Sequence, residues 1–241
     1  MEEETIKIKK NDLWKFTTFV LIAIVLIGGF FMFKGGKTTT NNSIANTEGA
    51  VNLQVFIDDA SLYPSLGPDN AENVVIEFSD FQCPYCALAS GLPAWVQDYQ
   101  SQYSDLIGSA GKIQQMATDG KIRFIYVPMS FLGQESVYAA QAGLCANQQE
   151  KFWEMHDALF TSHDGQENNG KFSKNNLKEI AKDISGLDTG KFNSCLDNDE
   201  TLSDVQKAAS EASKVVSGTP AFYVNGQQVS ASWTQLSSSL A

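Results

Sequence analysis

The sequence has few of the side chains that bind zinc or copper and few of those that bind nucleic acids. It contains two histidines and four cysteines in 241 residues, and neither histidine lies near the one C-x-x-C pair. A zinc site would need a second C-x-x-C or a C-x-x-H, and neither occurs. A basic stretch is also absent, since 17 lysines and arginines stand against 28 aspartates and glutamates. This composition disfavours nucleic-acid binding and indicates a solvated acidic surface.

One long hydrophobic run without charges lies near the N-terminus, at residues 16–33. Its 18 residues would span about 27 Å as a helix, close to the hydrocarbon thickness of a bilayer, about 30 Å. We predict an uncleaved membrane anchor. A cleaved signal peptide is the alternative, but the bulky GGFFMFK at the end of the run is unlike an A-x-A cleavage site.

The charges around this run predict its orientation. Four lysines precede it and two follow it closely, which places the N-terminus in the cytoplasm. The chain is then divided into a cytoplasmic tail at residues 1–15, the anchor at 16–33, a linker at 34–50 and a domain at 51–241 outside the cytoplasm. The linker, KGGKTTTNNSIANTEGA, has little to bury and is predicted to be flexible.

The C-x-x-C pair lies between a predicted strand and a predicted helix. Residues 74–78 are apolar or β-branched except for Glu77, which is typical of a buried parallel strand. Cys83-Pro84-Tyr85-Cys86 follows, and Ala-Leu-Ala then favours helix. Both sulfurs would lie at a helix N-terminus, which favours an anion. We predict that Cys83 is the attacking thiolate and Cys86 the resolving thiol, although half a zinc site or an inert disulfide has the same spacing.

The rest of the chain predicts a mixed α/β domain with a helical insertion. We expect a short strand at residues 53–57 and a strand at 121–128. Between them, the helix after the dithiol is expected to continue past residues 91–93, with a kink or break at Pro93. About ninety residues with helical periodicity follow, and we predict an inserted helical subdomain at about 130–216. Asn225-Gly226 predicts a hairpin between strands at 221–224 and 227–229, followed by a terminal helix at 232–240.

Both histidines are expected to be structural. His156 shares a helix face with apolar and aromatic residues, so it is predicted to be hydrogen-bonded and half-buried rather than a ligand. His163 lies in the polar sequence SHDGQENNG and is predicted to be exposed.

Three motifs in order give the chain a family resemblance. FSDFQCPYC, AAQAGLCANQQEKFWEMHDALF and SGTPAFYVNG together resemble the DsbA-like thiol:disulfide oxidoreductases, over about residues 53–236. The resemblance implies a thioredoxin-like α/β fold with an inserted helical subdomain, here preceded by one transmembrane helix. It also implies dithiol exchange without a cofactor, exported cysteine-containing proteins as substrates, and a quinone-linked membrane thiol oxidase as the partner.

The same resemblance assigns roles around the dithiol. Pro220 would be a cis-proline facing the two cysteines, and the backbone of Thr219 would pair with an extended substrate peptide. Pro84 and Tyr85 would contact the same substrate. Glu77 is the only charge in its strand and matches the buried acid thought to assist proton transfer at the resolving cysteine, whereas the alternative is a solvated Glu at an edge.

Two further features leave alternatives open. Cys145 and Cys195 enclose about fifty residues and are predicted to form a second, structural disulfide in an oxidising compartment, unless they are buried free thiols. Tyr85 is neutral where CPHC relatives have a histidine, so we expect the pKa of Cys83 to lie below that of a free thiol but above that of those relatives.

The sequence thus predicts a membrane-anchored, extracytoplasmic oxidoreductase that donates the Cys83–Cys86 disulfide to exported proteins. A reductase or isomerase is the main alternative, because the residues do not fix the direction of electron flow. A metallochaperone that holds copper or zinc at the dithiol is the other, but it would need another soft ligand beside the cysteines.

Overall fold

The computed structural model describes residues 52–241. The predicted tail, the anchor at 16–33 and the linker lie outside the described residues. None of the helices in the described part combines the length and the apolar character that a bilayer crossing requires.

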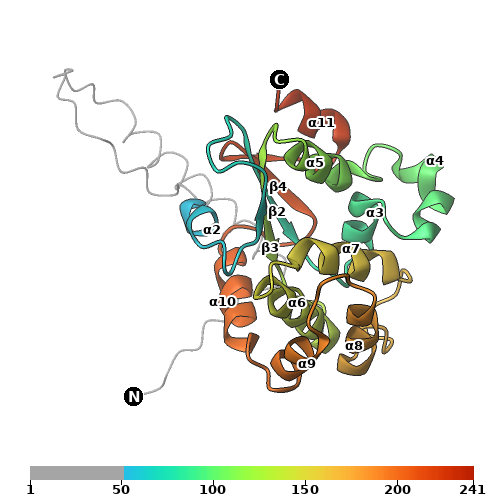
Figure 1. Ribbon diagram of the computed structural model, residues 1–241. Coiled ribbons are helices and arrows are strands. Elements are labelled where there is room, and N and C mark those ends of the chain that lie inside the picture. Colours follow the sequence, from blue (N-terminus) through green and yellow to red (C-terminus); the bar gives the residue numbers. More distant parts are fainter. Residues whose placement is uncertain (1–51) are drawn as a thin grey trace, which may run out of the picture. The chain divides into compact units, whose positions relative to one another are not determined.

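A five-stranded mixed sheet forms the centre of the described domain (Figure 1). Its spatial order is β1-β3-β2-β4-β5, in which β2 is parallel to β3 and antiparallel to β4. The central strand β2 is buried over almost its whole length because neighbouring strands and helices cover it. The strand bounds are β1 (Ser65–Leu66), β2 (Val74–Ser79), β3 (Arg123–Pro128), β4 (Ala221–Val224) and β5 (Gln227–Val229).

Two apolar cores lie on the two faces of this sheet. Because side chains alternate along a strand, Ile76 and Phe78 of β2 face one core, and Val75 faces the other. The first core contains α2 (Gln54–Asp58) and α10 (Leu202–Ala212). The second contains residues of α3 (Pro84–Ser90), α5 (Ser109–Thr118) and α11 (Trp233–Ser238).

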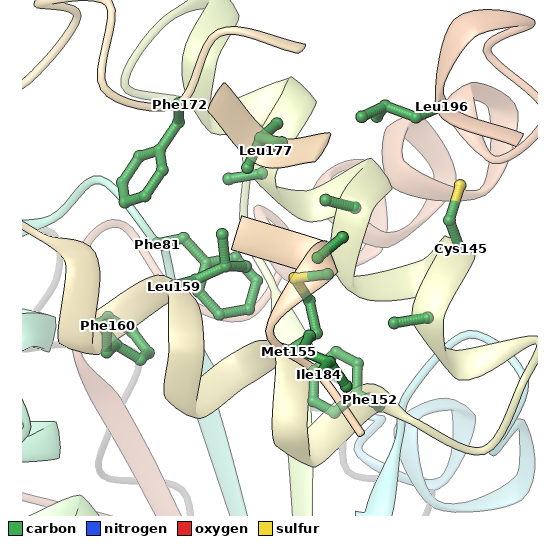
Figure 2. Packing of buried hydrophobic residues seen from close by; sticks show 14 of the residues in the cluster. Phe81, Cys145, Phe152, Met155, Leu159, Phe160, Phe172, Leu177, Ile184 and Leu196 are labelled. Carbon is green, nitrogen blue, oxygen red and sulfur yellow. The ribbon is translucent and has the colours of Figure 1, made fainter. Parts of the chain in front are cut away.

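A run of helices without a strand separates β3 from β4. It comprises α6 (Gln134–Asn147), α7 (Phe152–Ser162), α8 (Lys174–Lys182), α9 (Thr189–Asp197) and α10. Figure 2 shows the core of this helical block, where Met155, Leu159 and Phe160 of α7 lie near Phe81, which comes from the turn after β2. The helical block therefore packs directly against the segment that carries the dithiol.

A disulfide bond joins Cys145 on α6 to Cys195 on α9, with an S–S distance of 1.97 Å. The two residues are 50 apart in the sequence, so the bond links two helices of the block across a long loop. A loop of this length corresponds to about 4 kcal/mol of stabilisation through the unfolded chain. The sulfurs lie among apolar side chains of the block's core, and both residues are buried.

Most predicted elements are present, and two differ. The strand at 121–128, the hairpin and the terminal helix are confirmed by β3, β4, β5 and α11. The predicted strand at 53–57 is wrong, because this segment forms helix α2. Its apolar residues suit either structure at this length, and the helix lets Phe56 pack edge-on against Tyr63 and Phe78, each with ring centroids 5.0 Å away.

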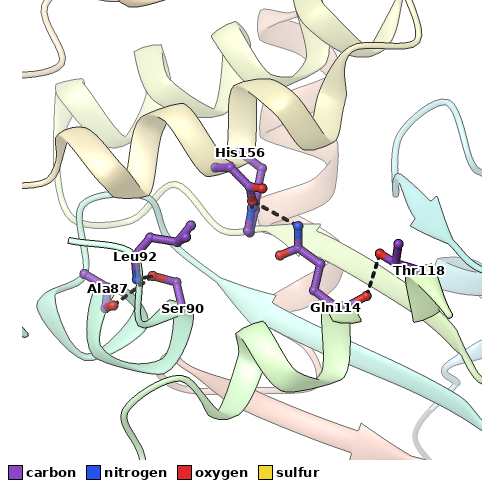
Figure 3. Close-up of polar contacts among 7 residues, drawn as sticks. Ala87, Ser90, Leu92, Gln114, Thr118 and His156 are labelled. Atoms are coloured by element: carbon purple, nitrogen blue, oxygen red, sulfur yellow. Dashed lines mark hydrogen bonds and ion pairs between the residues drawn. The ribbon is translucent and has the colours of Figure 1, made fainter. Parts of the chain in front are cut away.

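The helix after the dithiol is also shorter than predicted. α3 ends at Ser90, because Gly91 adopts a left-handed conformation with φ 73° and closes the helix. Figure 3 shows the polar contacts at this end, where Ser90 Oγ donates to the Ala87 carbonyl at 2.8 Å and accepts from Leu92 N at 3.2 Å. The 3₁₀ helix η1 (Ala94–Tyr99) and the short α4 (Gln100–Tyr103) then precede α5.

Candidate active site

The dithiol lies where strand β2 leads into helix α3. Cys83 is the N-cap residue, and Cys86 lies in the first turn, with Pro84 as the first helical residue, where a missing N–H costs little. Both cysteines are free thiols. Cys83 is 6% exposed and Cys86 is fully buried, so only Cys83 has a surface that a substrate sulfur can approach.

Local hydrogen bonds and burial give the two thiols different pKa values. The Cys86 thiol lowers the pKa of Cys83 to about 7, assisted by the backbone N–H groups of Cys86 and Tyr85 at the start of α3, although burial opposes the shift. Burial and the neighbouring Cys83 raise the pKa of Cys86 well above its usual value. Near neutral pH the site can therefore hold a Cys83 thiolate beside a Cys86 thiol, which is the division of roles that exchange chemistry needs.

The loop before β4 brings Thr219 and Pro220 to the same place. The Thr219–Pro220 peptide bond is cis, and Cys83 Sγ lies 3.6 Å from the carbonyl oxygen of Thr219. The two segments are 136 residues apart in the sequence. The structure thus assembles Cys83, Cys86, Thr219 and Pro220 at one site, with Tyr85 half exposed at its rim.

Glu77 is buried in the middle of the sheet. It lies on β2 between Tyr126 of β3 and Phe222 of β4, and it is 1% exposed. Burial raises the pKa of Glu77 to about 8, and the charge of Cys83 adds to the shift. The carboxyl group can therefore hold a proton at neutral pH and release it slightly above neutral pH, as a proton donor and acceptor would.

Tyr126 and Ser79 accompany Glu77 and were not predicted from the sequence. Tyr126 packs in the same cluster as both active-site cysteines, and burial raises its pKa well above the usual value. Within the described residues, Glu77 Oε2, Ser79 Oγ and the Tyr126 hydroxyl have no hydrogen-bond partner. The sequence shows only that Ser79 follows one predicted apolar strand and that Tyr126 lies within another. It does not indicate that either side chain lies near Glu77.

Asp80 fixes the turn between β2 and α3. It accepts hydrogen bonds from Gln82 N at 2.9 Å and Ser136 Oγ at 2.8 Å, and also from the backbone N–H groups of Phe131 and Leu132. Burial nevertheless raises its pKa to about 6. The aspartate therefore ties the dithiol turn to the start of the helical block.

His163 supports the turn from the other side, and its predicted exposure is wrong. It is 3% exposed, and its Nδ1 accepts from Gly165 N at 2.9 Å. Its Nε2 is therefore the protonated nitrogen and donates to the Gln82 carbonyl at 3.0 Å. This partner is 81 residues away, so the polar loop around His163 gave no indication of it. His156 is more buried than predicted, at 3% exposure, and its Nδ1 pairs with Asp157 at 2.8 Å.

Comparisons with known proteins give the same family as the site. A family model described as thioredoxin matches residues 107–240, more than half of the chain. The chain belongs to the thioredoxin family. It is a DsbA-like thiol:disulfide oxidoreductase of that family, and its mixed sheet with surrounding helices is the thioredoxin-like fold.

Individual relatives of this thioredoxin-family chain include two kinds of protein. It is 27% identical over 171 residues to the probable disulfide bond formation protein D of Bacillus anthracis, covering 69% of this chain and 71% of that protein. It is 30% identical over 192 residues to the Na(+)/H(+) antiporter NhaA 1 of Salinispora arenicola, covering 76% of this chain but only 24% of the antiporter. The crystal structure of oxidised BdbD from Bacillus subtilis superposes with a TM-score of 0.60 at 23% identity, covering 75% of this chain and 92% of that one.

Proposed function

We propose that this oxidoreductase acts outside the cytoplasm as a donor of the Cys83–Cys86 disulfide to exported proteins. The observation that carries the proposal is the unequal thiol pair, in which Cys83 is partly accessible with a pKa of about 7 and Cys86 is buried with a raised pKa. The printed names of its Bacillus relatives, disulfide bond formation proteins, favour the donating direction.

The proposed reaction transfers two electrons from the substrate thiols to the Cys83–Cys86 disulfide. A substrate thiolate attacks the Cys83 sulfur of the Cys83–Cys86 disulfide, forms a mixed disulfide with Cys83 and releases Cys86, which takes up a proton. A second substrate thiolate then attacks the substrate sulfur of the mixed disulfide, forms the substrate disulfide and releases Cys83 as a thiolate. The lowered pKa of Cys83 makes it a good leaving group, and Glu77 would supply or remove the proton of Cys86.

The substrate peptide would lie in an extended conformation along the loop that holds Thr219 and Pro220. Cys83 already lies 3.6 Å from the Thr219 carbonyl, so a peptide paired with that backbone would bring its cysteine to the partly accessible sulfur of Cys83. Pro84 and Tyr85 flank the same approach. After each cycle the dithiol needs reoxidation, and a quinone-linked membrane thiol oxidase is the partner that the family resemblance suggests.

Anchoring by residues 16–33 would place the domain outside the cytoplasm. In spheroplasts that produce the full-length chain, a small membrane-impermeant maleimide added after an impermeant reductant should label Cys83. Labelling that appears only after the cells are lysed would contradict this orientation. The same reagent applied to lysed cells provides the reference for full labelling.

The reduction potential tests the direction of electron transfer. Equilibration of the full-length protein with glutathione, followed by mass spectrometry of the peptide that contains both active-site cysteines, should give a value near or above about −180 mV. A value near about −270 mV, as in thioredoxin, would instead make the chain a reductase. The measurement decides between the two directions, because a Cys83 pKa of about 7 resembles that of thioredoxin more than that of strongly oxidising relatives.

A further inference from the structure

A loop built between α3 and α5 places aromatic residues beside the dithiol. The chain leaves α3 at Gly91 and returns at Gly108, whose N–H donates to the Leu88 carbonyl at 2.9 Å. The two glycines lie so close that a Cβ atom on Gly91 would be 2.8 Å from the Gly108 Cα. The intervening residues include η1 and α4, which lie next to the N-terminal turn of α3.

This loop and α3 enclose a pocket of about 450 Å³ with four aromatic side chains in its wall. Trp95 and Tyr99 meet at right angles with ring centroids 5.8 Å apart, and Tyr99 lies 6.4 Å from Tyr103. Tyr85, two residues after Cys83, completes the series with its ring 5.8 Å from that of Tyr103. We call these four residues the aromatic cage. Their contiguous rings offer several faces to one ligand group.

The cage is connected by hydrogen bonds to the dithiol turn. Trp95 Nε1 donates to the His163 carbonyl at 2.7 Å, and the imidazole of His163 donates to the carbonyl of Gln82, the residue before Cys83. Gly165, held by His163, also lines the pocket. The position of the cage relative to Cys83 is therefore fixed before a substrate arrives, which reduces the entropy that binding would cost.

Two carboxylates give the pocket its charge. Asp98 and Asp164 line it and are exposed, and neither forms an ion pair within the described residues, while no lysine or arginine lies in its wall. Aromatic ring faces attract cations, and adjacent carboxylates add to this attraction. The charge and the shape of the pocket are thus complementary to a cationic side chain.

We propose that the aromatic cage binds a lysine or arginine side chain close to the reacting cysteine of a substrate polypeptide. This inference rests on the proposed function, because it assumes that the substrate is a protein with a cysteine that reaches Cys83. Tyr85 connects the cage with a second hollow, which is lined by Thr219 and Pro220. A peptide paired with Thr219 would therefore pass Tyr85 and present a nearby side chain to the cage.

The test compares peptides that differ only in side-chain charge. Each peptide has one cysteine, with lysine, norleucine or glutamate at the two positions before it and the two positions after it. The peptide is mixed with the oxidised full-length protein. The rate of mixed-disulfide formation is followed by acid quench and mass spectrometry. We expect the lysine peptide to react about fivefold faster than the norleucine peptide, with the glutamate peptide slowest, and salt to reduce the preference.

Variants separate the cage from the overall negative charge of the protein. Asp98→Asn removes one carboxylate of the pocket wall, and Tyr99→Leu removes a ring face without changing charge. Each should reduce the lysine-to-norleucine rate ratio at least twofold. Asp204→Asn, an exposed carboxylate on α10 away from both hollows, is the matched control and should retain the ratio.

Four results would overturn the inference. Equal rates for the lysine and norleucine peptides would show that the cage does not select a cation, while the proposed disulfide donation would stand. A faster norleucine peptide would assign the cage to an apolar side chain instead. An equal loss of preference in Asp204→Asn and Asp98→Asn would show that the preference arises from the overall negative charge of the protein and not from the cage. If no peptide reacts, the proposed function fails, and the inference fails with it.

Discussion

Replacing Cys83 with alanine should reduce disulfide transfer to a substrate peptide on the order of a thousandfold or more, which is the scale at which enzymes respond to the loss of a covalent nucleophile. The reason is that Cys86 is fully buried and its pKa is raised, so it cannot replace Cys83 as the reacting sulfur. Cys86→Ala should have a different effect. Cys83 remains a reactive thiolate in this variant. Offered a disulfide-linked peptide dimer, it should attack one sulfur, release the other peptide as a thiolate and form a Cys83–substrate mixed disulfide, which accumulates because no resolving thiol is available.

Mass spectrometry after acid quench would distinguish the two variants, because only Cys86→Ala should gain the mass of the one peptide that remains attached to Cys83. The matched control is the Cys145→Ala, Cys195→Ala double variant, which changes two buried cysteines in the helical block. It should still transfer the Cys83–Cys86 disulfide. Circular dichroism would establish that each variant is folded. Substantial transfer by Cys83→Ala, or a mixed disulfide formed through Cys86, would contradict the assignment of Cys83 as the attacking residue.

Replacing Glu77 with glutamine should make the protein more stable at alkaline pH. Burial raises the pKa of Glu77 from 4.5 to about 8, so the folded protein holds a proton that the unfolded chain has released. Wild-type stability is therefore lost as the pH rises from about 4.5 to about 8, and the loss is complete above that range. It amounts to roughly 5 kcal/mol. Glutamine does not ionise, so the free energy of unfolding of the variant should lack this decline.

Denaturant unfolding of the oxidised protein at pH 5 and pH 9 would measure this effect, since neither active-site cysteine titrates in the disulfide form. Glu72→Gln, which changes an exposed carboxylate just before β2, is the control and should follow the wild type.

The same Glu77→Gln substitution should slow thiol–disulfide exchange about tenfold or more and flatten the pH profile of the exchange rate, because proton transfer at Cys86 loses its carboxyl group. Unchanged exchange rates across pH would remove Glu77 from the reaction.

Local patterns predict a large part of this fold because they depend on neighbouring residues. The strand before Cys83, the helix that begins at Pro84 and the Asn225-Gly226 hairpin all follow from short-range conformational preferences. The long helical stretch before β4 follows from its periodicity. α2 did not follow, because a short, mostly apolar segment suits both helix and strand and only packing of Phe56 decides between them.

The candidate site is predictable to a smaller extent. The C-x-x-C motif identifies the dithiol, and the family resemblance points to Glu77, Thr219 and Pro220. The supporting contacts are not local: His163 meets Gln82 across 81 residues, and Ser136 meets Asp80 across 56. A polar loop sequence carries no information about a partner so distant. Such contacts emerge only when the helical block packs onto the sheet.

The close approach of Gly91 and Gly108 assigns substrate recognition to the loop between them and redox chemistry to α3, two functions that one helix would otherwise have to combine. Since the ends of the intervening loop are held together, most of its residues can change without moving Cys83 or Cys86. Substrate preference could then diverge among descendants of this protein while its redox chemistry is inherited intact. For protein engineering, the same arrangement makes this loop a natural place to diversify in a library, with the dithiol left as it is.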